Sequence, residues 1–139
     1  MTPTVKFNEF DSYDFFNMIM EDYDISNAAR EFKFFKIPGR SGKLDATDYF
    51  GEIYEDRDIN MIFYSKRNID ETIELQSQLD TLINGKRMRL VFSNDPGHYW
   101  DARITKIVTV KIAKNMIKVN IDAVAYPYKY NLITGEEVL

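Results

Sequence analysis

The sequence contains no cysteine, and this one absence excludes several kinds of site. A chain without thiols has no cysteine nucleophile, no disulfide framework and no thiolate-bound metal. There is also only one histidine, His98, so a histidine cluster around a metal ion is excluded as well. We therefore predict no metal site and no cofactor.

Features typical of membrane and nucleic-acid-binding proteins are equally scarce. No apolar run approaches the roughly 20 residues of a membrane-spanning helix, and the start, MTPTVKFNEF, lacks the basic and apolar regions of a signal peptide. The net charge is −4, so no excess of basic residues indicates nucleic-acid binding. We expect a soluble protein made inside a cell, without a membrane partner.

What the sequence does contain is a high share of apolar and aromatic residues. Of its 139 residues, 45% are hydrophobic and 14% aromatic, which suits one domain that buries roughly two-thirds of its unfolded surface. We predict an α+β fold, mostly antiparallel β and sandwich-like, with one amphipathic helix. The domain is expected to span residues 1–130, followed by residues 131–139 as a fraying tail or a severed link to a missing domain.

Alternation of apolar and polar residues locates the strands. Residues 30–37 (REFKFFKI) read as a strand with a phase change at Phe34 and Phe35, which fits a bulge or burial on both sides. The other predicted strands lie at Val5–Phe7 and at residues 11–19, 55–64, 87–92, 102–112 and 116–125, with a turn at 94–97. In residues 55–64 the apolar side chains that share one face are Ile59, Met61 and Phe63.

One segment, NIDETIELQSQLDTLINGK, has helical periodicity instead. Asn68 precedes Glu71 by three residues, the spacing of a capping box, and Gly85 supplies a stop signal. We predict an amphipathic surface helix of about four turns, packed on a sheet. Its expected apolar stripe comprises Ile69, Ile73, Leu79, Leu82 and Ile83.

The glycine-rich stretch PGRSGK invites comparison with a phosphate-binding loop. Such a loop needs G-x-x-x-x-G-K-[ST] between a strand and a helix. Here Gly39 and Gly42 are only three apart, Leu44 stands where serine or threonine is required, and no convincing helix follows. Pro38 ends strand pairing and the glycines permit positive φ, so we predict a tight exposed loop. Arg40 and Lys43 would present charge to a partner protein.

Aromatic residues suggest two further surfaces. Tyr99 and Trp100, beside His98, are the kind of rings that a glycan-binding module uses, and we keep that function as an alternative. In AVAYPYKYN, Pro127 breaks the last strand, and the flanking tyrosines have an apolar body and a polar tip, which suits a surface buried on assembly. Those tyrosines are Tyr126, Tyr128 and Tyr130.

A second alternative is a small hydrolase that uses a pair of acids. Four carboxylates lie close together in the sequence, at Glu52, Glu55, Asp56 and Asp58. Two of them would suffice for acid–base chemistry, but a run of acids on a strand is more often a solvated face. We rank this alternative last and predict that the protein is not an enzyme.

Several motifs, read in order, resemble the N-terminal domain of the distal tail protein of long-tailed, non-contractile bacteriophages. FNEFDSYDF leads into a strand that ends in P-G-R-x-G, RDINMIFY follows, and a helix ends in LDTLING. A D-P-x-x-Y element comes next, and the domain closes with YPYKY. The match covers nearly the whole chain, and the order and spacing of the motifs carry it.

The resemblance implies a virion protein at the tail tip, assembled in the host cytoplasm. It implies a homohexameric ring, with the tail tube protein on one face, the baseplate hub or tail-associated protein on the other, and DNA passing through without specific binding. Ser41 replaces a commonly acidic residue, and larger members continue into a galectin-like domain that is absent from this sequence. The expected contact residues are Pro38, Gly39, Arg40, Gly42, Lys43, Tyr126, Pro127, Tyr128 and Tyr130.

Overall fold

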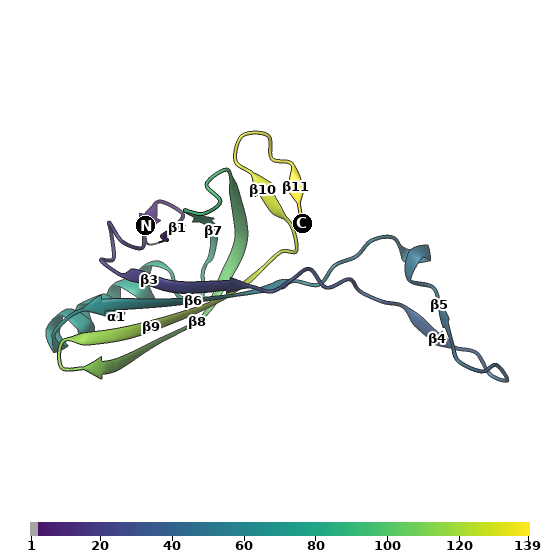
Figure 1. The fold of residues 1–139 in the computed structure, drawn as a ribbon, viewed down its shortest axis with the longest axis horizontal. Coiled ribbons are helices and arrows are strands. Elements are labelled where there is room, and N and C mark those ends of the chain that lie inside the picture. Colours follow the sequence, from purple (N-terminus) through teal and green to yellow (C-terminus); the bar gives the residue numbers. More distant parts are fainter. Residues whose placement is uncertain (1–2) are drawn as a thin grey trace.

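The computed structural model describes residues 3–139, which form a curved antiparallel sheet, one α-helix against it and a long arm that projects from one end (Figure 1). The nine strands of the main sheet are β1 (Val5–Phe7), β2 (Phe10–Asp11), β3 (Ile19–Ile25), β6 (Arg57–Lys66), β7 (Arg87–Phe92), β8 (His98–Ala113), β9 (Met116–Ala125), β10 (Lys129–Asn131) and β11 (Glu137–Val138). The arm carries β4 (Phe34–Lys36), β5 (Lys43–Asp45) and the 3₁₀ helix η1 (Thr47–Phe50). The predicted α+β class is confirmed.

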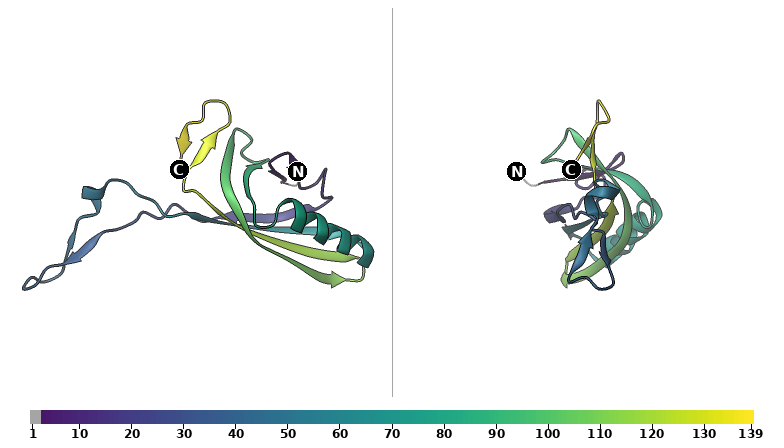
Figure 2. Two further views of the ribbon diagram at one scale, coloured as in Figure 1. Left: turned by 180° about the vertical axis from the view of Figure 1, so that it is seen from behind. Right: turned by 90° about the vertical axis from the view of Figure 1, so that its right-hand side faces the viewer.

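The order of strands in the main sheet is β2-β1-β7-β8-β9-β6-β3, and β10 pairs with both β8 and β11. The sheet bends at β8, which pairs with β7 at Trp100–Arg103 and with β9 from Ala102 to Ala113. Its two ends therefore face each other as two layers, with α1 (Ile69–Leu82) against the flatter layer (Figure 2). Among the described residues no helix is both long enough and apolar enough to cross a membrane.

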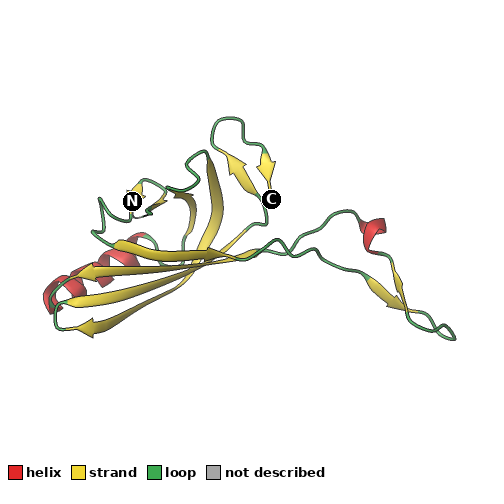
Figure 3. Cartoon of the chain, in the orientation of Figure 1, coloured by secondary structure: helices red, strands yellow, loops and turns green. Residues whose placement is uncertain are grey.

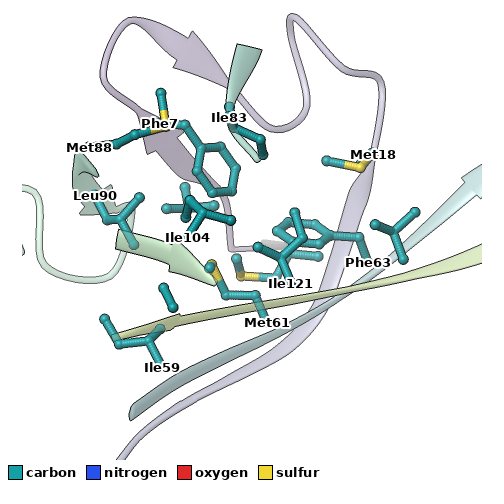
Figure 4. Close-up of a cluster of buried hydrophobic side chains, with 14 of the residues drawn as sticks. Phe7, Met18, Ile59, Met61, Phe63, Ile83, Met88, Leu90, Ile104 and Ile121 are labelled. Carbon is teal, nitrogen blue, oxygen red and sulfur yellow. The ribbon is translucent and has the colours of Figure 1, made fainter. Parts of the chain in front are cut away.

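The core fills the space between these layers. Alternate residues of β9 are buried, and the alternation predicted for residues 55–64 is confirmed because Ile59, Met61 and Phe63 of β6 are buried too. Phe7 from β1 meets Phe63 with ring centroids 6.4 Å apart, and Ile104 from β8 joins the same cluster (Figure 4). The opposite face of β6 and β9 is open to solvent or half-buried.

The capping box predicted for the helix is present. The Asn68 side chain accepts a hydrogen bond of 2.9 Å from the Glu71 backbone N–H, and the Glu71 carboxylate accepts one of 3.3 Å from the Asn68 N–H. The predicted apolar stripe is partly wrong, because Ile69 and Ile73 are exposed. The buried face is formed by Leu75, Leu79 and Ile83, which recur every four residues and lie on the other side of the helix from Ile73.

The strand predicted for residues 11–19 is wrong, because most of this segment is a turn. The Asp11 carboxylate accepts hydrogen bonds from the N–H groups of Tyr13 and Asp14, at 2.8 and 3.1 Å, and so replaces strand pairing. Asn17 has a φ of 54°, which takes the chain out of extended geometry. Phe16 lies in this turn and its side chain is buried in the core. The apolar residues around it have the spacing of a strand, which explains the wrong prediction.

Residues 131–139, predicted as a fraying tail or a severed link to another domain, belong largely to an ordered hairpin. Residues 129–138 form the β10–β11 hairpin, in which Tyr130 pairs with Glu137. The Asn131 side chain accepts hydrogen bonds from the N–H groups of Ile133 and Thr134, at 2.9 and 3.0 Å, and orders the turn. The hairpin is joined to the domain through β8, so the boundary predicted at residue 130 cuts through an ordered element.

Candidate protein-interaction surfaces

The arm comprises residues 27–56 and is an insertion between two adjacent strands (Figure 3). Where it leaves the sheet, the Ser26 N–H donates to the Asp58 carbonyl and the Asp58 N–H donates to the Ser26 hydroxyl, both at 2.9 Å. Those bonds continue the β3–β6 ladder to the base of the arm. The hydrogen-bond ladder of the sheet is therefore continuous up to the base of the arm, without a contribution from the inserted residues.

Hydrogen bonds order the arm along its length. Near its base the Glu55 N–H donates to the Ala29 carbonyl at 2.8 Å, and the Arg30 guanidinium pairs with Asp48 at 2.8 Å. Farther out, the Thr47 hydroxyl accepts from the Lys33 N–H at 3.0 Å. A partner that binds the arm therefore meets a pre-shaped ribbon and loses less conformational freedom than with a disordered segment.

The arm is apolar on both of its faces. Phe34 and Phe35 are consecutive, so their rings point to opposite sides of the ribbon. Phe34 lies 6.0 Å from Phe32 and Phe35 lies 6.2 Å from Phe50, measured between ring centroids. The large apolar side chains exposed along the arm are Phe32, Phe34, Phe35, Ile37, Leu44, Tyr49, Phe50 and Ile53.

The sequence predicted either a bulge or burial on both sides at Phe34 and Phe35, and neither is present in a single chain. The two residues are 53% and 47% exposed, and they pair in regular register with Asp45 and Leu44. The alternation that reads as a core strand therefore belongs to a ribbon outside the core. Exposed apolar surface of this extent is typical of sites that bind another molecule.

The predicted loop at residues 38–43 lies at the tip of the arm and is exposed. Gly39 and Gly42 have φ values of 79° and 77°, which only glycine adopts without strain. The tight exposed loop is thus confirmed, and the segment after it continues into β5 and η1. Arg40 and Lys43 are solvent-exposed there, and their role as contact residues stays a prediction.

A second surface lies where β9 runs into β10 beside the start of β8. The Arg87 guanidinium stacks 4.3 Å from the centroid of the Tyr126 ring, and that of Arg89 stacks 4.6 Å from Tyr99. Tyr99 in turn stacks on Tyr130, at 5.4 Å and 28°. We call these five residues, Arg87, Arg89, Tyr99, Tyr126 and Tyr130, the arginine–tyrosine face.

The structure brings two of the tyrosines predicted from YPYKY into this face and places Tyr128 nearby. Tyr128 meets Tyr54 at the base of the arm, with ring centroids 6.1 Å apart and edge to face. The two arginines were missed, although RMRLVF places them on the polar side of an alternating strand. Tyrosine and arginine on a rigid sheet are typical of the residues that dominate protein interfaces.

The residues proposed for glycan binding are arranged differently from an open platform. Trp100 is buried and lies under the Arg57 guanidinium, 5.1 Å from the ring centroid. Tyr99 lies between Arg89 and Tyr130. The carboxylates considered for a hydrolase, those of Glu52, Glu55, Asp56 and Asp58, are exposed along the base of the arm and the start of β6.

His98 belongs to a small polar cluster that joins the C-terminal hairpin to the β7–β8 turn. The Asp95 carboxylate contacts His98 Nδ1 at 2.9 Å through one oxygen and accepts a hydrogen bond of 2.6 Å from Lys129 Nζ through the other. Burial alone would raise the pKa of Asp95, but the hydrogen bonds from Lys129 and His98 outweigh it and hold the pKa below its ordinary value.

This cluster predicts a pH-dependent contribution to stability. Because the pKa of Asp95 is lower in the folded state, its carboxylate stabilises the fold above about pH 4, the ordinary pKa of aspartate, and the effect is lost as the pH falls through the folded-state value. Asp95→Asn should lower the melting temperature at pH 7 by at most about 3 °C, since the site is partly exposed. The exposed Asp14→Asn is the control. A difference from the parent that grows with acidification contradicts this account.

The flat part of the sheet, β8-β9-β6-β3, has a free edge on each side. On one side it is β3, and on the other it is the second half of β8, because β7 pairs with β8 only at Trp100–Arg103. Strand pairing defines which residues are level, that is, at the same height along the strands. Ile19 in β3 pairs with Tyr64 in β6, Tyr64 pairs with Lys118 in β9, and Lys118 pairs with Val110 in β8. All four therefore lie level with one another, on the open face of the sheet. Ile19 and Val110 are 50% and 44% exposed.

Comparisons with known proteins bear on the fold. No protein-family model matches the chain. No curated protein matches it either. Among solved structures it resembles the Dit protein (gp 19.1) of phage SPP1, described as a paradigm of the hub adsorption apparatus in phages that infect Gram-positive bacteria. The TM-score is 0.75 at 15% identity, over 94% of this chain and 53% of that one.

This likeness establishes a shared fold, in agreement with the resemblance found in the sequence motifs. The chain spans about half the length of the Dit protein. At 15% identity the likeness carries the architecture and not the activity or the partners. A functional assignment has to rest on the surfaces described above.

Proposed function

We propose that this chain is a structural component of a phage or prophage tail tip, where six copies form a closed ring that joins the tail tube to the baseplate hub and leaves a channel for DNA. The observation that carries the proposal is the arm, an ordered ribbon with large exposed apolar side chains on both faces. An exposed apolar side chain contributes favourable free energy only when a partner removes it from water. The Dit-like fold supports the tail as the place where that partner is found.

The two free sheet edges support a ring of identical copies. Edge strands expose unpaired backbone groups, and a head-to-tail contact that repeats by rotation covers both edges of every copy. The strands alternate in direction across β8, β9, β6 and β3, so β3 of one copy would pair with β8 of the next in antiparallel fashion. Six of the seven residues of β3 then lie opposite the free stretch of β8, and Ile25 lies opposite Ile104, whose N–H already donates to the Lys86 carbonyl at 2.9 Å.

The strand register within one copy determines which residues of β3 and β8 would lie opposite each other across the contact. Ile25 is level with Ile59, Ala123 and Ile104 in the sheet, as Ile19 is with Val110. Joined edge to edge at equal height, β3 of one copy would end where β7 begins to occupy the edge of its neighbour. The exposed Ile19 would then lie beside the exposed Val110 of the next copy, and both would lose apolar surface to water.

Ile19→Glu is expected to prevent ring formation. The carboxylate would have to be buried beside Val110 of the next copy, and an unpaired buried charge is far more costly than the apolar contact it replaces. Light scattering and negative-stain microscopy of the parent should show rings of six 16.4-kDa chains, about 98 kDa in all, and single chains of the variant.

The control for that experiment is Ile69→Glu, an equally drastic change at an exposed position on the helix, which should leave the rings intact. Rings formed by Ile19→Glu would contradict the edge pairing. A parent that stays a single chain at high concentration and binds neither tail tube nor hub protein would contradict the proposed function as a whole.

A further inference from the structure

We propose that the arm of each chain docks, through its returning segment at residues 49–55, on the arginine–tyrosine face of the next copy in the ring. This inference rests on the proposed ring and adds the surface that receives the arm. Three observations carry it: the end of the sheet at which both surfaces lie, their charges, and the apolar residues that each leaves exposed.

The first observation is position. Under the antiparallel pairing of β3 with β8 of the next copy, Ile25 lies opposite the neighbour's Ile104. The arm continues from Ile25, and the Glu31 N–H donates to the Ile53 carbonyl at 2.6 Å, so Ile53 is level with a residue six positions beyond the end of β3. On the neighbour, Tyr99 lies five residues before Ile104. The returning segment and the arginine–tyrosine face therefore lie at the same end of the flat sheet, the end at which Arg57 pairs with Ala125.

The second observation is charge. The returning segment carries Glu52 and Glu55, both exposed. On the receiving face, Arg87 already pairs with Asp101 at 2.9 Å, whereas the Arg89 guanidinium makes no ion pair with any of residues 3–139. Stacking on Tyr99 fixes the plane of that guanidinium, and a fixed planar guanidinium is suited to a carboxylate from another chain.

Charge also decides which part of the arm makes the contact. The tip is basic, with Lys36, Arg40 and Lys43 and no acid between them, and it would be repelled by the arginines. The returning segment combines its two acids with the exposed side chains of Phe50 and Ile53. Those apolar groups match the half-exposed Tyr126 on the receiving face.

A rival receiving surface lies at the other end of the molecule. It is a groove of about 300 Å³ between α1 and the end of the β8–β9 hairpin, lined by Ile69, Ile73, Lys111 and Lys114 among others. It also combines apolar and basic side chains. In the edge-paired ring, however, the arm and the groove lie at opposite ends of the strands, as they do in the single chain (Figure 1). The groove therefore serves as the negative control.

Crosslinking tests the contact directly, because the chain has no cysteine of its own. In the double variant Ile53→Cys with Val91→Cys, one thiol lies on the returning segment and the other on β7, two residues beyond Arg89. The charged contact residues Glu52, Glu55 and Arg89 stay intact. A short bismaleimide should join neighbours in succession and give a ladder of covalent species on a denaturing gel, up to the ring size. Each single variant should stop at dimers.

The matched control is Ile53→Cys with Ile73→Cys, which places the second thiol in the groove and should give no ladder. A ladder from this control, or intact rings in the microscope without a ladder from the first variant, overturns the docking surface while leaving the ring in place. Absence of rings in the parent chain overturns the proposed function and this inference with it.

A charge exchange provides an independent measurement. Arg89→Glu should weaken ring assembly about tenfold or more, and adding Glu52→Arg or Glu55→Arg in the same chain should restore most of that loss. The exchange Lys111→Glu, in the groove, should leave assembly unchanged. A loss on Arg89→Glu that neither exchange restores, or an equal loss on Lys111→Glu, contradicts the docking of the returning segment on Arg89.

Discussion

A chain in which residues 28–56 are replaced by Asn-Gly is expected to fold normally and to form no rings. The register of β3 and β6 places residue 26 opposite 58 and residue 27 opposite 57, so a two-residue turn closes the hairpin with the geometry that Asn-Gly favours. The apolar core contains no residue of the arm, so the shortened chain keeps its apolar cluster. Thr47 is buried, but its hydrogen bonds are to Lys33 and Asp45 within the arm itself. It loses the ribbon through which, in the proposed ring, one copy would hold the next.

The measurement combines circular dichroism, thermal unfolding and light scattering. The shortened chain should keep a cooperative transition within about 4 °C of the parent, because less than about 1 kcal/mol of native contact is removed from the sheet. Its mass should be that of one chain at concentrations where the parent forms rings. Rings of the shortened chain would show that the sheet edges suffice and that the arm serves another partner.

A smaller deletion separates the tip from the rest of the arm. Lys36 pairs with Lys43, so Asn-Gly in place of residues 37–42 removes the glycine-rich loop and preserves the β4–β5 ribbon. If the loop at residues 38–43 is itself a contact, this variant also fails to assemble. If the aromatic ribbon and the returning segment carry the contact, it assembles as the parent does.

The elements that the sequence predicted well are those whose structure is decided locally. The helix begins at its capping box, since Asn68 and Glu71 satisfy each other's backbone N–H groups whatever surrounds them. The strands β6 and β9 alternate cleanly because one of their faces is core and the other is open. In these segments a short window of sequence contains the physical cause of the structure.

The arm could not be predicted in this way. REFKFFKI has apolar residues in the pattern of a core strand, and that pattern does not say whether they are covered by the core of the same chain. Whether Phe34 is buried by its own chain or by another is a matter of tertiary placement. The same limit applies to the turn at residues 11–18, where one carboxylate, that of Asp11, outweighed the apolar pattern.

The arginine–tyrosine face shows the limit for sites. Arg87 and Tyr126 are separated by 39 positions in the sequence and meet only because β7, β8 and β9 are adjacent in the sheet. The tyrosines were identifiable from the strand that Pro127 interrupts. The arginines could be assigned to the surface only from their stacking on tyrosine rings in the fold. Composition thus indicated the type of surface, and the fold supplied its members.

Truncating Leu79 to alanine is expected to be among the most damaging single changes in the chain. Leu79 is fully buried on the sheet side of α1, and a Leu→Ala change in a core costs about 2–5 kcal/mol through lost apolar contact and the cavity left behind. Ile73→Ala, on the same helix, is the matched control. Ile73 is 57% exposed, so it loses little contact and gains about 0.5 kcal/mol at most from the better helix propensity of alanine.

Urea unfolding of the two variants at one protein concentration measures the difference. Leu79→Ala should lower the midpoint strongly with an unchanged slope, and Ile73→Ala should match or slightly exceed the parent. This comparison tests which side of the helix meets the sheet, and therefore the orientation on which the open face and both free edges depend. Equal losses of stability in the two variants would mean that the Ile73 side chain is buried. The buried face of α1 would then be the apolar stripe predicted from the sequence, and the basis for the ring would be removed.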